Sequence, residues 1–148
     1  MEAEIIAAMS DLTRLVRRAF DARARAIGVT RPQWQVLTLI RRHEGINQGG
    51  LAELLEVEPI TVGRMIDRLQ EADMVERRAD PQDRRAWRLH LTQRGEALMV
   101  QLRPLAEDMF VEAFEGFAAS DQRAMFDLLE RMRQNLARKP ETAMVSNG

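Results

Sequence analysis

Hydrophobic positions recur every three or four residues through most of this chain, so each run would line one face of a helix. Six such runs follow one another. Some are bounded by residues that favour helix ends, such as Pro59 at a first helical position and Gly28 after a last one. The pattern predicts helices over residues 4–26, from Pro32 to Gly45, over Asn47–Leu55 and Pro59–Ala72, after Thr92, and from Ser120 onward.

The periodicity changes between the fourth and fifth predicted helices. Residues 87–91 alternate between apolar and polar side chains, which is typical of a half-buried strand with Trp87 and Leu89 on its apolar side. Residues 74–78 form a second strand-like run, and the polar, proline-containing stretch 79–85 joins the two. We therefore expect a β-hairpin with a charged tip.

The fourth predicted helix has two distinct sides. Thr61, Arg64 and Arg68 are spaced by three and four residues, so they share one polar surface. Apolar residues line the other side, and the short third helix likewise turns its leucines inward. The residues expected to face the core in these two helices are Leu51, Leu54, Leu55, Ile60, Ile66 and Leu69.

The order of these elements indicates a DNA-binding module. A short helix, a three-residue turn and a second helix with an arginine-bearing face are typical of a helix-turn-helix, and the hairpin that follows has the place of a wing. Arg64 is the best candidate for a bidentate guanine contact in the major groove, and Thr61 for a thymine methyl or a phosphate. The narrow hairpin tip suits the minor groove, with Arg84 and Arg85 as candidates.

The overall charge does not by itself favour a nucleic-acid binder. The formal net charge is −1, with 22 Lys and Arg residues against 23 Asp and Glu residues. Lys139 is the only lysine, so the positive charge is nearly all arginine, whose planar fork suits phosphate and guanine. The segment from Pro59 to Arg94 contains eight arginines and six acidic residues, so its surplus of positive charge is small. A solvated helix and hairpin with mixed ion pairs is therefore an alternative interpretation of this segment.

Several kinds of site are disfavoured by the composition. The chain has no cysteine, which excludes disulfides, thiol redox sensing and thiolate metal sites. His43 and His90 are the only histidines, so we expect no metal site and no cofactor. No apolar run is long enough to span a bilayer, and the acidic start lacks the basic region of a secretory signal. We expect a cytoplasmic protein without membrane contact.

An enzyme is the least favoured class. The sequence has no Gly-rich phosphate loop, nucleophile elbow or metal-ligand cluster, so we expect no catalytic residues. Asp80 and Asp83 lie in a turn that is too exposed for tuned acid-base chemistry. A protein-interaction module that keeps the winged-helix shape without binding DNA is the second hypothesis, since fold does not guarantee function.

Three stretches resemble the MarR family of bacterial regulators. Residues 51–69, which read LAELLEVEPITVGRMIDRL, are similar to that family's helix-turn-helix. Residues 80–85, DPQDRR, and residues 89–95, LHLTQRG, are similar to its wing and to the exit into the next helix. The resemblance covers roughly residues 12–136 in element order and is specific in sequence from about Gln48 to Gly95.

The resemblance implies a mainly α fold with a small β-hairpin wing and dimerisation helices at both ends of one domain. Residues 33–92 would form the winged helix-turn-helix, residues 4–28 and 93–138 the dimerisation helices, and residues 139–148 a disordered tail. It further implies a homodimeric repressor whose recognition helices enter adjacent major grooves of a pseudo-palindromic operator in duplex DNA.

The family's wing also suggests individual roles. The arginine that matches Arg85 enters the minor groove, the aspartate that matches Asp83 orients it, and Arg84 then meets phosphate. Asp73 stands where the family usually has glycine, and aspartate tolerates that backbone conformation better than most residues. The predicted DNA contacts are Gln48, Thr61, Arg64, Arg68, Asp83, Arg84 and Arg85.

MarR-like proteins often bind small aromatic or anionic molecules between the dimer base and the winged domain. In this chain Trp34 is expected near that cleft, and Arg17, Arg18 and His43 would supply positive charge to a carboxylate. The alternatives are a core role for Trp34 and solvated or paired surface positions for the other three. The absence of cysteine argues against the family's peroxide-sensing branch, and the scarcity of histidine against its zinc-sensing branch. A small effector that releases the DNA, or no effector at all, remains.

Overall fold

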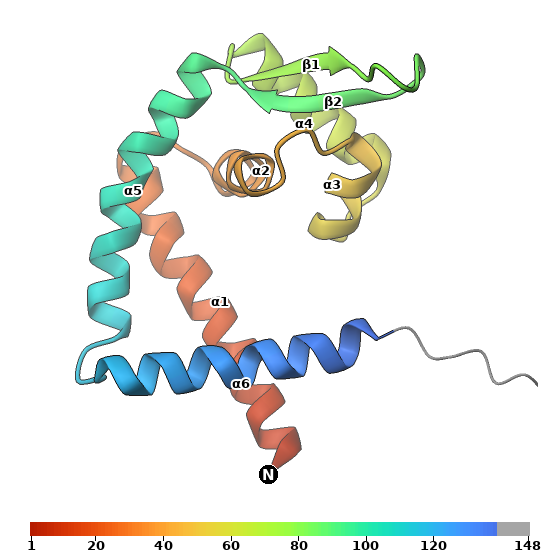
Figure 1. Cartoon of the computed structure of the whole chain (residues 1–148). Helices are drawn as coiled ribbons and strands as arrows, with labels where there is room; N and C mark the ends of the chain where they lie inside the picture. Colours follow the sequence, from red (N-terminus) through yellow and green to blue (C-terminus); the bar gives the residue numbers. More distant parts are fainter. Residues whose placement is uncertain (139–148) are drawn as a thin grey trace, which may run out of the picture. The chain divides into compact units, whose positions relative to one another are not determined.

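The computed structural model describes residues 1–138, which form six helices and one antiparallel pair of strands (Figure 1). This confirms the predicted fold class. The expected tail, residues 139–148, lies outside the described residues. The elements are α1 (Glu2–Ala26), α2 (Arg31–Arg42), α3 (Gln48–Leu55), α4 (Pro59–Glu71), β1 (Val75–Ala79), β2 (Trp87–Leu91), α5 (Gln93–Ala113) and α6 (Ala119–Ala137).

Contacts within the chain divide it into two compact units, Met1–Val111 and Glu112–Gly148. The first unit contains the helix-turn-helix, the hairpin, α1, α2 and nearly all of α5. In the second, α6 begins where Asp121 accepts a hydrogen bond from the backbone N–H of Ala118 at 2.8 Å. None of the described helices is long and apolar enough to cross a membrane.

Side chains cap the starts of α2, α3 and α5 in the first unit. Thr30 accepts a hydrogen bond from the N–H of Gln33, whose own side chain accepts from the Thr30 N–H. Asn47 begins α3 by accepting from the N–H of Gly50 at 2.7 Å, and Thr92 begins α5 by accepting from the N–H of Gly95 at 3.0 Å. These caps satisfy backbone donors that a helix start leaves without an intrahelical partner.

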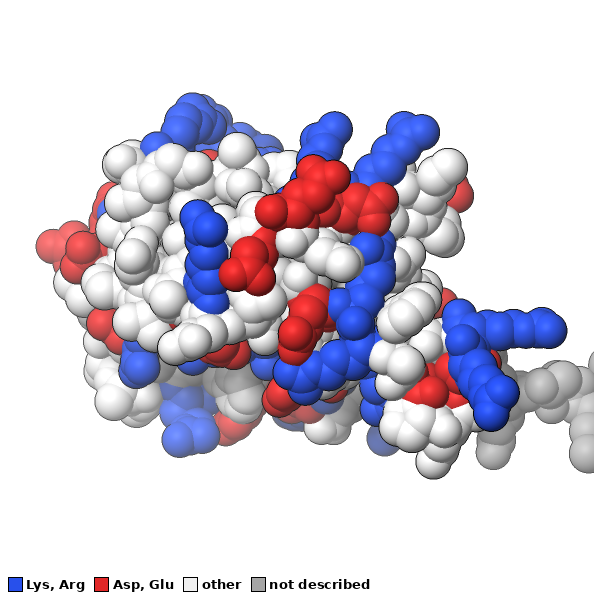
Figure 2. Space-filling model, turned by 90° about the horizontal axis from the view of Figure 1, so that it is seen from above, with Lys and Arg blue, Asp and Glu red and all other residues white. Residues whose placement is uncertain are grey.

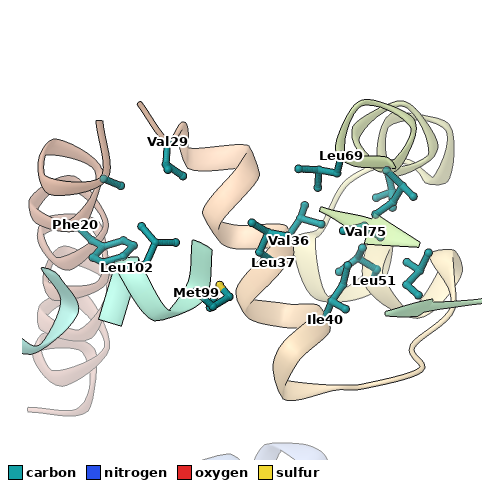
Figure 3. Close-up of a cluster of buried hydrophobic side chains, with 14 of the residues drawn as sticks. Phe20, Val29, Val36, Leu37, Ile40, Leu51, Leu69, Val75, Met99 and Leu102 are labelled. Carbon is teal, nitrogen blue, oxygen red and sulfur yellow. The ribbon is translucent and has the colours of Figure 1, made fainter. Parts of the chain in front are cut away.

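Helix α2 is the centre of the hydrophobic core, since it packs against α1, α3, α4 and β2. Figure 3 shows Val36, Leu37 and Ile40 of α2 between side chains from α1 and α5 on one side and from α3, α4 and β1 on the other. All three are fully buried. This core holds the recognition helix and the hairpin on one scaffold.

The bend between α4 and β1 has the conformation expected of Asp73. Its φ is 56°, in the left-handed region that most residues avoid. The Thr92 hydroxyl donates to the Asp73 carbonyl, and the Thr92 N–H donates to the Met74 carbonyl at 3.1 Å. The bend is thus tied to the start of α5, which fixes where the hairpin leaves the helical core.

Three residues expected in the core are exposed. Leu54 is 48% exposed because Leu51 and Ala52 occupy the buried side of α3. Ile60 is 67% exposed because the buried side of α4 is formed by Val62, Ile66 and Leu69.

Trp87 is the third of these residues. It is 50% exposed because it pairs with Ala79 at the end of the hairpin away from the core. Only Leu89 in the middle of β2 is fully buried, where it pairs with Arg77 across the hairpin. Apolar and polar side chains therefore alternate along β2 as predicted, but the apolar side chains become more exposed toward the hairpin tip.

Candidate nucleic-acid interface

The α3–turn–α4 segment has the geometry of a helix-turn-helix. Glu56 ends α3 with a φ of 55°, and the N–H of Val57 donates back to the Ala52 carbonyl at 3.1 Å. Pro59 is the first residue of α4, a position from which no intrahelical hydrogen bond is donated, so the missing N–H of proline costs nothing there. The predicted recognition residues Thr61, Arg64 and Arg68 are all exposed on α4.

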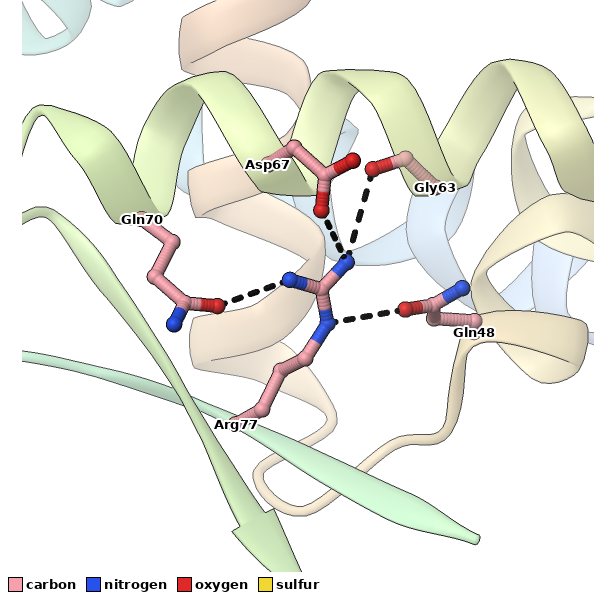
Figure 4. A network of polar contacts seen from close by, with 5 residues as sticks. All are labelled: Gln48, Gly63, Asp67, Gln70 and Arg77. Carbon is pink, nitrogen blue, oxygen red and sulfur yellow. Dashed lines mark hydrogen bonds and ion pairs between the residues drawn. The ribbon is translucent and has the colours of Figure 1, made fainter.

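The side chain of Arg77 on β1 joins the hairpin to the helix-turn-helix (Figure 4). Its Nε donates to Oε1 of Gln48 on α3 at 3.0 Å, and one terminal nitrogen donates to Oε1 of Gln70 at 2.7 Å. The other terminal nitrogen donates to Oδ1 of Asp67 at 2.7 Å and to the carbonyl of Gly63 at 3.4 Å. One guanidinium therefore binds both helices of the module from the strand that leads to the wing.

In this network Gln48 holds the side chain of Arg77, a role in addition to the DNA contact predicted for it. Its side-chain oxygen is already used by Arg77, so only the amide NH₂ is free to donate to another partner. Arg77 itself was not among the predicted site residues. It lies 29 residues from Gln48 in sequence, and no local spacing connects them.

The tip of the hairpin is built on two aspartates. Oδ1 of Asp83 accepts from the backbone N–H of Arg85 at 2.9 Å, so this carboxylate holds the backbone that carries Arg85. Oδ1 of Asp80 accepts from the N–H of Gln82 at 2.9 Å, and its Oδ2 lies 3.2 Å from Nε of Arg88. The backbone N–H of Gln82, followed by Arg88, holds the pKa of Asp80 below its usual value against desolvation.

Ion pairing divides the arginines between Pro59 and Arg94 into two groups. Arg77, Arg78 and Arg88 pair with Asp67, Glu76 and Asp80. The other five arginines of this segment, Arg64, Arg68, Arg84, Arg85 and Arg94, form no ion pair and no side-chain hydrogen bond with any residue that the structure describes.

Four of these unpaired arginines are those that the sequence assigned to DNA. Figure 2, which views the molecule from above the hairpin, shows basic side chains next to acidic ones rather than one continuous basic surface. The net charge of this segment is therefore small, although its paired and unpaired arginines lie in different places. Acidic residues neutralise the arginines on the two strands of the hairpin and leave those on α4 and in the turn at its tip without a partner among the described residues.

Trp34, the proposed effector residue, lies in a polar and aromatic cluster between α1 and α2. Its indole N–H donates to Oδ1 of Asp21 at 2.8 Å, and its ring meets that of Phe20 edge-on at 4.8 Å between centroids. Asp21, only 8% exposed, also accepts from Nε of Arg31 at 2.6 Å. Burial raises the pKa of Asp21, but the hydrogen bonds from Arg31 and Trp34 together lower this pKa by more than burial raises it, so the net shift is downward.

The four candidate effector residues are only partly brought together. Arg17 and Arg18 are exposed on α1, one turn before Phe20 and Asp21. His43 follows the last turn of α2, nine residues from Trp34 and so roughly 14 Å along the helix. Any anion bound at Trp34 would also meet the carboxylate of Asp21, which Arg31 already neutralises.

Comparison with known proteins agrees with this geometry. The model of the MarR family matches residues 29–87. The uncharacterized HTH-type transcriptional regulator YdgJ of Bacillus subtilis is 27% identical over 135 residues, which cover 91% of this chain and 80% of that protein.

Solved structures agree over most of the chain. A MarR transcriptional regulator from Methanosarcina mazei Go1 matches with a TM-score of 0.77 and 28% identity, over 90% of this chain and 96% of that one. A mutant of MarR from E. coli, complexed with operator DNA, matches with a TM-score of 0.72 and 25% identity, over 87% of this chain and 93% of that one. The family consists of transcriptional regulators, not enzymes, as expected. Residues 29–87 therefore form a winged helix-turn-helix of the MarR family, and the whole chain is similar to DNA-binding transcriptional regulators of that family.

Proposed function

We propose that this protein is a homodimeric, sequence-specific repressor that binds a pseudo-palindromic operator and is released by a small molecule. The observation that carries the DNA part is the set of unpaired arginines on α4 and at the hairpin tip. A guanidinium that the protein leaves without a partner can bind phosphate or a base edge without first breaking an internal ion pair.

The two arginine groups have different tasks in this proposal. Arg64 and Arg68, with Thr61, face the major groove from the outer side of α4, where base edges distinguish all four pairs. Arg85 enters the minor groove, while Arg84 meets phosphate. The hydrogen bond from the Arg85 N–H to Asp83 supports this placement, because it orders the backbone at the tip before DNA arrives.

Alanine substitution in the wing tests this assignment. We expect Arg85→Ala to weaken operator binding on the order of tenfold or more in titrations at fixed salt, because a contact in the groove is lost. Arg78→Ala is the matched control, since Arg78 lies on the same hairpin but pairs with Glu76. Equal affinity of the Arg85→Ala protein and the wild type would refute the wing assignment.

The second candidate function is a protein-interaction module, which the small charge surplus keeps open. Selection from random duplex DNA separates the two. A DNA-binding repressor enriches one palindromic motif and loses affinity steeply with added salt, because bound arginines release counterions. A dimer that enriches no sequence and binds duplex without salt dependence would favour the interaction module.

A small ligand can release the DNA only if it binds more tightly to the arrangement of the two winged units that cannot bind DNA than to the DNA-bound arrangement. The half-buried Trp34 contacts Phe20 and Asp21, and Arg17 and Arg18 lie one turn before those two residues on α1, which supports an aromatic or anionic effector. Trp34 and Trp87 are the only tryptophans. In a Trp87→Phe protein, the fluorescence of Trp34 alone would report titration with aromatic acids. No change with any aromatic acid that dissociates the DNA complex would exclude Trp34 from the effector site.

A further inference from the structure

Ile60 is a large apolar side chain that the fold leaves mostly exposed and outside the hydrophobic core. It is the second residue of α4 and is 67% exposed, while the hydrophobic positions that hold α4 to the core are Val62, Ile66 and Leu69. Successive helix residues are rotated by about 100°, so Ile60 lies about 160° around the helix from Val62. It therefore points away from the core.

The same geometry places Ile60 among the unpaired arginines. It precedes Arg64 by four residues and Arg68 by eight, so these three side chains form one row along the outer face of α4. Arg64 and Arg68 form no ion pair within the described residues 1–138. The apolar group is thus continuous with the cationic surface that the proposed function directs into the major groove.

Thr61 has different surroundings from Ile60. It lines an open hollow of about 690 Å³ at the turn between α3 and α4, together with Glu53, Glu56 and Glu58. Ile60 is not part of the lining of that hollow. The two neighbouring side chains therefore present different chemistry, because Thr61 has a hydroxyl beside carboxylates and Ile60 has only methyl and methylene groups beside arginines.

We propose that Ile60 is a specificity-determining residue that recognises a thymine of the operator through its 5-methyl group, one in each half-site. This inference rests on the proposed function. The major-groove edges of the bases carry hydrogen-bond donors, acceptors and a single apolar feature, which is the methyl group of thymine. An isoleucine side chain forms no hydrogen bonds with those edges. It can therefore stabilise the complex only by apolar contact with that methyl group.

The proposal is tested with operator DNA in which deoxyuridine replaces thymine. Deoxyuridine keeps the base pair and lacks only the methyl group. An operator half-site is first obtained by selection with the wild-type protein, and each thymine is then replaced singly. We expect one position where the replacement weakens wild-type binding about fourfold, which corresponds to one buried methyl group. The same replacement should leave the affinity of the Ile60→Ala protein unchanged.

Two further variants sharpen the assignment. Ile27→Ala makes the same truncation at another exposed isoleucine, 44% exposed after the last turn of α1, and should keep the full wild-type response. Thr61→Ser removes only the methyl group of Thr61 and should also keep it. Alanine favours helix more than isoleucine, so Ile60→Ala should not unfold α4, and an unchanged circular dichroism melt confirms this.

The outcomes separate the two claims. Loss of the deoxyuridine response in Thr61→Ser but not in Ile60→Ala would transfer the contact to Thr61 and overturn the inference. An equal response of wild type and Ile60→Ala at every thymine would overturn it as well, while operator binding itself stands. If the wild type selects no sequence, the proposed function fails, and this inference fails with it.

Discussion

At the scale of single residues, the position of the wing depends on Arg77. Its guanidinium donates to Gln48 on α3 and to Gln70, Asp67 and Gly63 on α4, and its side chain is 20% exposed. Five donors in one plane can bind acceptors on both helices at once, which a lysine ammonium at the same place cannot do. The network therefore couples the hairpin to the recognition helix through one side chain.

Removal of this guanidinium should affect stability and DNA binding together. We expect Arg77→Met to lower the free energy of unfolding by about 2 kcal/mol in urea denaturation, because several hydrogen bonds to one charged group are lost. Arg77→Lys should keep only part of the stability that Arg77→Met loses. Operator affinity should fall in both variants although Arg77 contacts no DNA in our proposal. A stable Arg77→Met protein with normal affinity would show that the strands alone position the wing.

At the scale of elements, the junction between α4, the hairpin and α5 leaves no room for a side chain at Gly95. A Cβ on this residue would lie 2.1 Å from the carbonyl oxygen of Met74, which is backbone and cannot swing aside. The close approach exists because Thr92 binds the bend at Asp73 and also caps α5. The glycine thus allows the helix to start directly against the first residues of the hairpin.

Gly95→Ala should therefore destabilise the first unit. We expect a loss of about 3 kcal/mol in the free energy of unfolding, the upper end of the range typical of overpacking, measured by thermal or urea denaturation. Gly49→Ala on α3 is the matched control, since its Cβ would meet only Asn47 at an ordinary 3.5 Å. A Gly95→Ala protein as stable as the Gly49→Ala protein would contradict the close packing of this junction.

At the scale of the whole molecule, the apolar positions near the two ends of the chain have no core of their own. Leu12 on α1 is 54% exposed, and no residue of α6 is buried within the described part of the chain. Phe126, Leu129 and Leu136 of α6 are exposed as well. Such surfaces mark interaction sites, and the proposed function assigns them to a second copy of this chain. A dimer would also double every DNA contact of the winged unit.

A charge placed on the exposed apolar side of α1 should separate the protomers. We expect Leu12→Asp to shift the protein from dimer toward monomer in sedimentation experiments at micromolar concentration, and operator affinity should fall with it. Leu54→Asp introduces the same charge at a similarly exposed leucine of the helix-turn-helix and should leave the dimer intact. A wild-type protein that sediments as a monomer would refute the dimer.

The sequence alone was sufficient to identify the elements and their order. Hydrophobic periodicity and capping residues such as Thr30, Asn47 and Thr92 act over a few residues, so the chain itself specifies where most helices begin and end. Asp73 was also recognised as the residue of the left-handed bend. The predicted DNA contacts remain a proposal, but the pairing of their neighbours supports them.

The tertiary structure decided what depends on residues that are distant in sequence. It placed Ile60 and Trp87 at the surface, because a periodic pattern does not reveal which apolar positions a neighbouring element will cover. It also paired Arg77 with Gln48 and Asp67, and so divided eight arginines of similar sequence context into bound and unpaired groups. Local spacing predicts which residues share a face, whereas burial and charge neutralisation depend on the whole fold.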